Sequence, residues 1–267
     1  MESIIVLGTG HALVTKCYNT CFALYDGDEY FLVDAGGGNG ILSQCEQAGI
    51  QWGNVHHLFV THRHTDHVLG AIWVIRVIGR MILSGNYAGN LNIYCHAQLG
   101  DAILTICEVT LQKNITDLFG DRLRIIKVDD EEKKQILNYS IVFFDIHSTK
   151  AKQFGFSTRL NNGRRLTCLG DEPYQSSCYP YVNQCDWLLS EAFCLYSQRD
   201  IYKPYTMNHS TVKDACELAQ KMNVKNLVLW HTEEDNLAHR QKLYTVEGKL
   251  YYNGNIFVPN DLDYIVL

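Results

Sequence analysis

The sequence has few of the features that mark a secreted or membrane-spanning protein. Its ten cysteines include no Cys-x-x-Cys pair and follow no regular spacing, so we expect reduced thiols and not a disulfide framework. No basic and apolar leader precedes the first strand-like segment, Ser3–Leu7. The most apolar window, Val68–Leu83, contains Arg76 and Arg80, which argues for a buried helix and against a membrane span. These absences favour a cytoplasmic protein with no membrane partner.

Basic residues are also too few for a typical nucleic-acid-coating surface. Lys and Arg number 23 against 29 Asp and Glu, which gives a net charge of −6, and no cluster of five or more basic residues occurs. A long polyanion is therefore a less favoured partner. There are only four prolines and no Pro/Gly/Ser-rich linker, and 46% of the residues are hydrophobic. We expect one domain over residues 1–267 with an ample core.

The apolar pattern predicts the same order of elements in both halves of the chain. The first half begins with segments whose apolar and polar residues alternate as in strands, and helices and strands then follow one another. The second half repeats this order. Predicted strands include Ser3–Leu7, Cys21–Tyr25, Tyr30–Val33, His57–Val60, Tyr139–Ile146, Arg165–Leu169, Trp187–Ser190 and Asn226–Trp230. A helix is predicted over Thr211–Met222, with Ser210 as its cap. The pattern indicates an α/β protein with two packed sheets and helices outside.

One segment is unusually rich in metal-binding side chains. The strand-like Leu58-Phe59-Val60 leads into Thr61-His62-Arg63-His64-Thr65-Asp66-His67, so three histidines and one aspartate occur within six residues. Imidazoles and carboxylates are the ligands that suit zinc and similar divalent ions. A strand that ends in a loop can turn several of these side chains toward one point. The segment therefore predicts a metal site.

This HxHxDH pattern resembles the signature of the metallo-β-lactamase superfamily, and the resemblance covers nearly the whole chain. It implies a four-layer αβ/βα sandwich built from two similar halves and a metal-dependent hydrolase activity. Three later segments match the family's remaining ligands, each at the end of an apolar run: Val142–His147, Arg165–Asp171 and Leu227–His231. Asp34, at the end of the Phe31–Asp34 segment, matches an aspartate that supports the metal loop.

The resemblance implies a site with two divalent metal ions. The first ion is assigned to His62, His64, His147 and Asp171, and the second to Asp66, His67, Asp171 and His231. Asp66 counts both as a ligand and as a catalytic residue. Zinc is the default ion, and manganese or iron also suits these ligands. In such sites a hydroxide that bridges the metals is the nucleophile.

Two further segments resemble ribonuclease Z, within the phosphodiesterase branch of the superfamily. Ser190-Glu191-Ala192-Phe193 is similar to its HEAT motif, and His209-Ser210-Thr211 is similar to its HST loop. The resemblance implies that His209 protonates the leaving group and that Glu191 orients His209. The resemblance therefore also implies a phosphodiester substrate.

The chain departs from ribonuclease Z where that family carries an arm that grips tRNA. Only residues 148–170 separate His147 from Asp171, and two strands and a turn account for them. The acidic run Glu233-Glu234-Asp235 after the last ligand is expected to place negative charge near the site. Both features favour a small or short phosphodiester over tRNA.

Several alternatives stay open at this point. A carbon-ester hydrolase, such as a thioesterase, lactonase or glyoxalase II-like enzyme, would use the same metals, and a tRNA 3′-processing endonuclease would use the same catalytic pair. A diiron redox role is disfavoured because Arg63 stands where those proteins carry glutamate. The remaining histidines, His11, His56, His57, His96 and His239, match no ligand position and are expected to serve packing or the surface. A homodimer is also left open.

Overall fold

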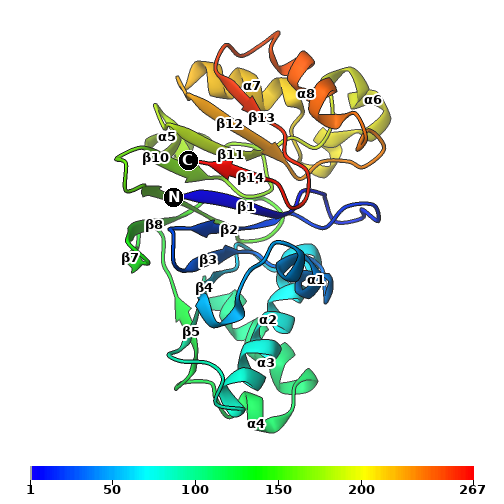
Figure 1. Cartoon of the computed structure of the whole chain (residues 1–267). Helices are drawn as coiled ribbons and strands as arrows, with labels where there is room; N and C mark the ends of the chain where they lie inside the picture. The colour runs from blue at the N-terminus through cyan, green and yellow to red at the C-terminus, as the bar shows by residue number, and fades with distance from the viewer. Residues whose placement is uncertain (1) are drawn as a thin grey trace.

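The computed structural model describes residues 2–267, which form two mixed sheets that face each other with helices on their outer sides (Figure 1). Within these residues each sheet has seven strands. The first sheet has the order β14-β1-β2-β3-β4-β5-β6 and the second the order β13-β12-β11-β10-β9-β8-β7. The four-layer arrangement predicted from the sequence is confirmed.

The strands of both sheets are short and mostly buried, as sheets covered on both faces require. The first sheet comprises β1 (Ser3–Gly8), β2 (Cys21–Tyr25), β3 (Tyr30–Val33), β4 (Val55–Phe59), β5 (Leu91–Cys95), β6 (Leu123–Lys127) and β14 (Tyr264–Val266). The second comprises β7 (Lys133–Ile136), β8 (Tyr139–Asp145), β9 (Phe154–Arg159), β10 (Arg165–Cys168), β11 (Trp187–Glu191), β12 (Asn226–Trp230) and β13 (Asn255–Phe257).

The helices follow the same division between the two halves. The first half contributes α1 (Gly40–Gln47), α2 (Thr65–Leu83), α3 (Ala97–Thr110) and α4 (Lys113–Thr116). The second contributes α5 (Tyr179–Val182), α6 (Arg199–Tyr202), α7 (Val212–Lys221) and α8 (Arg240–Gly248). No helix of residues 2–267 is both long and apolar enough to cross a membrane, and this includes α2, which covers the most apolar segment of the sequence.

Three apolar layers hold the sandwich together. Leu32, Ile75 and Ile103 belong to the layer between the first sheet and its helices. Phe31, Phe143, Phe156 and Val228 belong to the layer between the two sheets, where Phe31 and Phe156 meet edge to face at 5.7 Å. Leu188, Val212 and Tyr244 belong to the layer under α7 and α8. Successive residues of one strand, such as Phe31 and Leu32, thus serve opposite faces of the sheet, as the two-residue period of a strand requires.

The start of α7 differs from the prediction. Thr211, and not Ser210, is the N-cap, because its hydroxyl accepts from the Asp214 backbone N–H while the Asp214 carboxylate accepts from the Thr211 N–H. Thr211 and Asp214 have the spacing of a capping box, which the sequence already contains. Ser210 makes a different contact: its backbone N–H donates to Glu191 Oε1 at 2.6 Å.

Gly70 allows α2 to approach the loop that carries Asp34. Its N–H donates to the Gly36 carbonyl at 2.8 Å, and a Cβ at this position would overlap the carbonyl oxygen of Ala35. We expect Gly70→Ala to destabilise the protein by about 3 kcal/mol or more, because backbone must move to relieve the clash. Thermal denaturation should show a fall in Tm of several degrees, at about 2–4 °C per kcal/mol. Gly53→Ala is the matched control, since no heavy atom lies within 4 Å of a Cβ there. Equal Tm values for the two variants would contradict the close approach.

Candidate metal and active site

The candidate residues follow the carboxyl ends of strands that run in the same direction. In the first sheet, β1, β3 and β4 run parallel, because β1 and β3 are each antiparallel to β2 and β4 is parallel to β3. In the second, β8, β10, β11 and β12 run parallel by the same reasoning. The carboxyl ends of parallel strands meet at one edge of a sheet, where α/β proteins commonly bind ligands. Side chains far apart in the sequence thereby reach one place.

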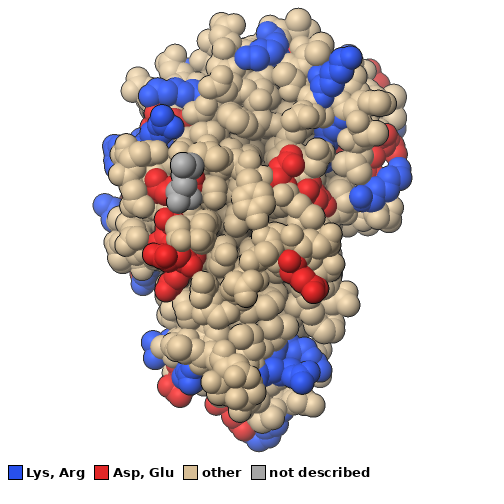
Figure 2. All heavy atoms as spheres, in the orientation of Figure 1, with Lys and Arg blue, Asp and Glu red and all other residues tan. Residues whose placement is uncertain are grey.

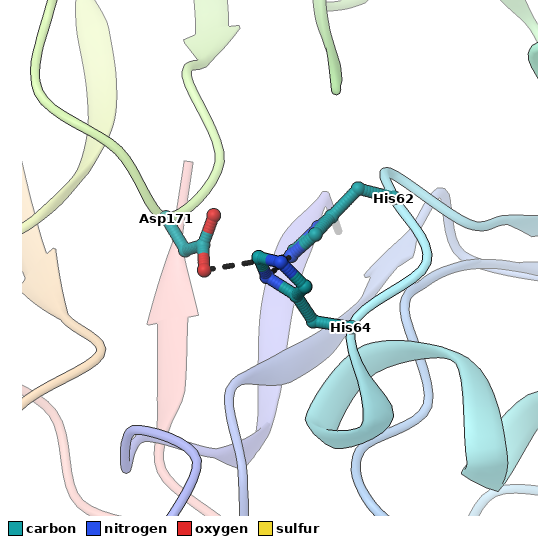
Figure 3. Close-up of side chains that lie close together, drawn as sticks. All are labelled: His62, His64 and Asp171. Carbon is teal, nitrogen blue, oxygen red and sulfur yellow. Dashed lines mark hydrogen bonds and ion pairs between the residues drawn. The ribbon is translucent and has the colours of Figure 1, made fainter. Parts of the chain in front are cut away.

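One group of possible ligands consists of His62, His64 and Asp171. Figure 3 shows the two histidines, from the loop after β4, turned toward the aspartate that follows β10. His62 Nε2 lies 2.8 Å from His64 Nδ1 and 3.5 Å from Asp171 Oδ2. The three ligand atoms lie within 4.8 Å of one another, which is close enough for one ion to contact all three.

A second group consists of Asp66, His67 and His231. Asp66 Oδ2 lies 3.3 Å from His67 Nε2 and 3.5 Å from His231 Nε2. Asp171 Oδ2 is 3.6 Å from the Nε2 atoms of both histidines. The same oxygen is therefore near both groups, which is the position of a carboxylate shared between two ions.

Asp34 helps to orient a histidine of each group, His67 directly and His62 through Thr61. Its Oδ2 accepts from His67 Nδ1 at 2.7 Å and from the Thr61 hydroxyl at 2.8 Å, and its Oδ1 accepts from the Thr61 N–H at 2.8 Å. The Thr61 hydroxyl also contacts His62 Nδ1 at 2.9 Å. Such outer partners fix the orientation of a ligand histidine and leave its Nε2 for the metal.

The charges of the site are strongly coupled. Burial alone would raise the pKa of Asp171, but His62, His67 and His231 hold it well below its usual value. Burial would likewise raise the pKa of Asp66, and His67 and His231 again lower it. Burial would lower the pKa of His67, whereas Asp34 and Asp66 raise it well above its usual value. A cation that binds His67 must therefore displace a proton, so acid should weaken metal binding.

Several buried atoms of the site have no hydrogen-bond partner within residues 2–267. Those of the predicted metal ligands are His67 Nε2, both ring nitrogens of His231, and Asp171 Oδ1. An unpaired buried polar atom costs about 1–3 kcal/mol, so evolution rarely retains several together. A divalent cation would pair with most of them at once. The donor set, imidazole nitrogen with carboxylate oxygen, fits zinc, manganese or iron.

The backbone around the site is strained at four residues that are not glycine. Asp34, His147, Asn208 and His231 have positive φ angles of 55°, 56°, 56° and 56°. The left-handed region is costly for such residues and is frequent at functional sites. The strain accompanies both an assigned metal ligand, His231, and the residue that supports the motif, Asp34.

His147 is the one predicted ligand that lies outside these groups. Its side chain is exposed, and its N–H is held by Asp145 Oδ1 at 2.7 Å. It follows β8 at the correct edge of the second sheet, and its left-handed backbone matches that of His231. The hydroxyl of the next residue, Ser148, donates to Glu172 Oε1 at 2.6 Å, and Glu172 directly follows Asp171 in the sequence. The assignment of His147 to a metal stays a prediction.

The predicted catalytic pair lies beside the second group. His209 and His231 have ring centroids 5.2 Å apart, and His209 Nδ1 lies 3.6 Å from Glu191 Oε2. The other oxygen of Glu191 accepts from the Ser210 N–H, so the carboxylate is fixed next to the loop of His209. Since Nδ1 faces Glu191, Nε2 is the atom of His209 that is left for a substrate. Glu191, His209 and His231 are also close enough together to hold an ion.

These side chains open into a cavity of about 490 Å³. Its wall includes Asp66, Asp171, His209, His231, Phe193, Met207, Leu13 and His11, together with the basic residues Arg63 and Lys150. The exposed Arg63 and Lys150 have no ion-pair partner among residues 2–267, in contrast to several other basic side chains. Two unpaired cations at its rim favour an anionic substrate.

The carboxylates that follow His231 do not line this cavity, but Glu234 lies near it: burial lowers the pKa of His11 in the cavity wall, and Glu234 partly opposes that shift. Glu233 is buried and bound to Tyr244 and Asn236. Glu234 accepts from the backbone N–H groups of Thr15 and Lys16 at 2.6 Å each. These two carboxylates therefore hold neighbouring segments in place.

Three of the remaining histidines serve packing or capping, as expected. His56 contacts the Tyr87 hydroxyl, His57 contacts the Tyr94 hydroxyl, and His96 caps α3 by accepting from the Leu99 N–H. His239 is exposed at the start of α8. His11 is different, because it lines the cavity, and the prediction that it serves packing or the surface was incomplete. It follows β1, which ends at the same sheet edge as β3 and β4, and no local motif in the sequence marks it.

Comparisons with known proteins agree with this geometry. The sequence model of the family described as "Anti-Pycsar protein Apyc1" matches residues 2–248. The ribonuclease Z of Methanocaldococcus jannaschii is 26% identical over 307 aligned positions, which cover 97% of this chain and 95% of the relative.

Solved structures show the same fold. The metallo-β-lactamase fold protein YhfI from Bacillus subtilis aligns with a TM-score of 0.79 and 17% identity over 99% of this chain and 98% of its own. The short form of human tRNase Z aligns with a TM-score of 0.75 and 22% identity, again over 99% and 98%. The predicted metallo-β-lactamase fold is confirmed, and the relatives bear out the predicted class of metal-dependent hydrolase.

Proposed function

The chain belongs to the family of the anti-Pycsar protein Apyc1, and from this premise we propose that it is a dinuclear-metal phosphodiesterase acting on a small or short phosphodiester. The observation that carries the proposal is the position of His209, 5.2 Å from the ring of His231 and in front of Glu191. A proton donor beside two groups of metal ligands suits the cleavage of a bond to a poor leaving group.

Two ions are proposed because Asp171 is near both groups. One ion would use His62, His64 and Asp171, with His147 as a further ligand, and the other would use Asp66, His67, Asp171 and His231. Zinc is the default, and manganese or iron suits the same donors. When bound, such a pair supplies a hydroxide nucleophile near neutral pH and offsets negative charge on the phosphoryl oxygens.

The side chains of the protein supply the remaining steps. Asp34 keeps the ring of His67 in one orientation and Thr61 that of His62, and the buried groups around Asp171 exclude bulk water from the floor of the cavity. As the bond from phosphorus to the leaving oxygen breaks, His209 Nε2 would donate a proton to that oxygen. Glu191 would keep His209 and its loop in position during this proton transfer.

A phosphodiester is preferred over a carbon ester for two reasons. A thiolate leaves without protonation, so a thioesterase has less need of a donor such as His209. The unpaired Arg63 and Lys150 at the rim also match a substrate that stays anionic throughout the reaction.

A small substrate is preferred over tRNA because nothing resembles an arm in residues 148–170. That segment is the antiparallel pair β9 and β10 with its connections. The alignment with the M. jannaschii ribonuclease Z extends over 307 positions, so the relative has residues that this 267-residue chain lacks. On the face that Figure 2 shows, Lys and Arg lie in separate small groups with acidic residues between them. Such a surface offers little grip to a long polyanion.

A substrate panel tests the proposal. We expect zinc- or manganese-loaded protein to hydrolyse bis-p-nitrophenyl phosphate and at least one short phosphodiester, such as a dinucleotide or a cyclic nucleotide. Thioesters should be cleaved far more slowly because a thiolate leaves without protonation, and lactones because they carry no negative charge for Arg63 and Lys150 to bind. A pre-tRNA should be cleaved no better than the minimal phosphodiester. The measurement is kcat/KM for each substrate at physiological salt.

Metal-stripped protein is the control, and its activity should return on reloading. Faster turnover of a thioester than of any phosphodiester would favour the carbon-ester alternative. Efficient cleavage at the 3′ end of pre-tRNA would favour the endonuclease alternative and would require a basic surface that the charge of −6 does not suggest.

A further inference from the structure

The loop after β1 forms one wall of the cavity and is fixed to the segment after His231. The His11 N–H donates to the Thr232 carbonyl at 3.1 Å, and the Thr232 N–H donates to the Thr9 carbonyl at 3.1 Å. Further along, both carboxylate oxygens of Glu234 bind Thr15, and one of them also binds the Lys16 N–H. The two chain ends of this loop are thus held to the strand end that supplies a proposed metal ligand.

Within this wall, the ring of His11 is held by an aromatic contact. Its centroid lies 4.8 Å from that of Phe193 in an edge-to-face arrangement of 72°. Phe193 stacks on His209 with centroids 5.1 Å apart and an interplanar angle of 11°. One buried phenyl ring therefore sets the positions of two imidazoles that line the same cavity.

The hydrogen bonding of His11 indicates which nitrogen carries its proton. The Leu13 backbone N–H points to His11 Nδ1 at 3.4 Å, so Nδ1 is an acceptor. In the neutral imidazole the proton then resides on Nε2, which is a donor. His11 belongs to none of the possible metal-ligand groups within residues 2–267.

We propose that His11 is a substrate-binding residue whose Nε2–H donates a hydrogen bond to a non-bridging oxygen of the phosphodiester, and that Glu234 positions it by holding its loop. The inference rests on the proposed phosphodiesterase function and adds a contact that the HxHxDH and HST motifs do not contain. A donor at this place contacts the anion in both the ground state and the transition state. It therefore lowers KM and takes no part in protonating the leaving group.

The test compares three replacements of His11 in the zinc-loaded protein. His11→Ala removes ring and donor, His11→Phe keeps a ring against Phe193 without a donor, and His11→Gln keeps an N–H of similar reach. We expect the first two to raise KM for bis-p-nitrophenyl phosphate about 10- to 100-fold, the range for a hydrogen bond to a charged group. The kcat should change less than about threefold, because such binding is equal in ground and transition states. His11→Gln should recover most of the loss.

Two further measurements separate binding from a structural role. The inhibition constant of inorganic phosphate should rise by the same factor as KM, and metal content should be unchanged. In wild-type protein, ¹⁵N NMR of the imidazole should show Nδ1 unprotonated. Glu234→Ala should raise KM by a smaller factor, since it loosens the loop that positions His11 but does not remove the imidazole donor. His239→Ala is the control, because His239 is exposed at the start of α8 and lies outside the cavity wall.

The outcomes distinguish this inference from the proposed function. Wild-type turnover of a phosphodiester together with an unchanged KM in His11→Ala would overturn the inference alone. A His11→Phe variant that behaves as wild type would show a packing role, and loss of metal in His11→Ala would show a ligand role, each of which also overturns it. If the wild type cleaves no phosphodiester but its phosphate affinity still depends on the N–H of residue 11, the proposed function fails and the binding role stands.

Discussion

Replacing Asp171 with alanine is expected to reduce bound metal from close to two ions per chain to well below one. Its Oδ2 lies within 3.6 Å of ligand nitrogens in both groups, so its loss weakens both sites together. Phosphodiesterase activity should fall to background because hydroxide generation and charge neutralisation depend on the ions. Elemental analysis after metal loading and desalting measures the number of bound ions per chain, and kcat/KM for a phosphodiester measures the activity.

A thermal measurement makes the Asp171 test independent of activity. An ion that binds only the folded state at 100 times its Kd stabilises that state by about 2.7 kcal/mol. Zinc should therefore raise the Tm of the wild type by several degrees and leave Asp171→Ala almost unchanged. Asp200→Ala is the control, because that carboxylate is 87% exposed on α6 and belongs to none of the ligand groups within residues 2–267. A metal content below about half an ion per chain in the metal-loaded wild type would contradict the dinuclear site.

The part of the site that the sequence could predict is the part encoded by local patterns. His62, His64, Asp66 and His67 lie in one short loop, and Asp171 and His231 each end an apolar run. A side chain at the end of a buried strand has little freedom in where it points, because both neighbours of the strand fix its edge. For this reason the structure brings these six side chains together as the family pattern implied.

His147 shows where such prediction stops. It ends an apolar run like the others, but its place depends on the conformation of the loop between β8 and β9. That loop contains a left-handed residue and is tied by Ser148 to Glu172, a contact between residues 24 positions apart. No local pattern encodes such a contact. The short edge strands β7, β13 and β14 were missed for a similar reason, since pairing with a neighbour and not apolar alternation defines them.

Glu234 and His11 illustrate contacts that only the tertiary structure shows. Glu234 binds backbone N–H groups more than 200 residues away, so one residue of the acidic run also holds the loop after β1 in place. A single histidine has no motif, and His11 could be recognised only from the topology. Since β1 ends at the same edge as β3 and β4, a residue that follows it reaches the site.

The replacement of His209 by alanine should separate proton donation from metal binding. His209 is assigned no metal, so the metal content of the variant should equal that of the wild type. Turnover of phosphodiesters should fall by about 10² to 10⁴, the usual range for a positioned proton donor. The loss should be larger for an alkoxide leaving group than for p-nitrophenolate, because p-nitrophenolate needs little protonation. His11→Ala should show no such dependence on the leaving group, which makes the two imidazoles distinguishable within one assay.

Glu191 provides the second arm of this experiment. In Glu191→Gln the amide oxygen can still accept from the Ser210 N–H, while the charge that faces His209 Nδ1 at 3.6 Å is lost. We therefore expect a smaller loss with the same dependence on the leaving group. The double variant should be no worse than His209→Ala alone, because residues that act as a unit are not additive. An equal loss for all leaving groups would show that His209 does not donate the proton. A fall in metal content would show instead that Glu191, His209 and His231 hold an ion, as their spacing permits, and the carbon-ester alternative would then become the stronger hypothesis.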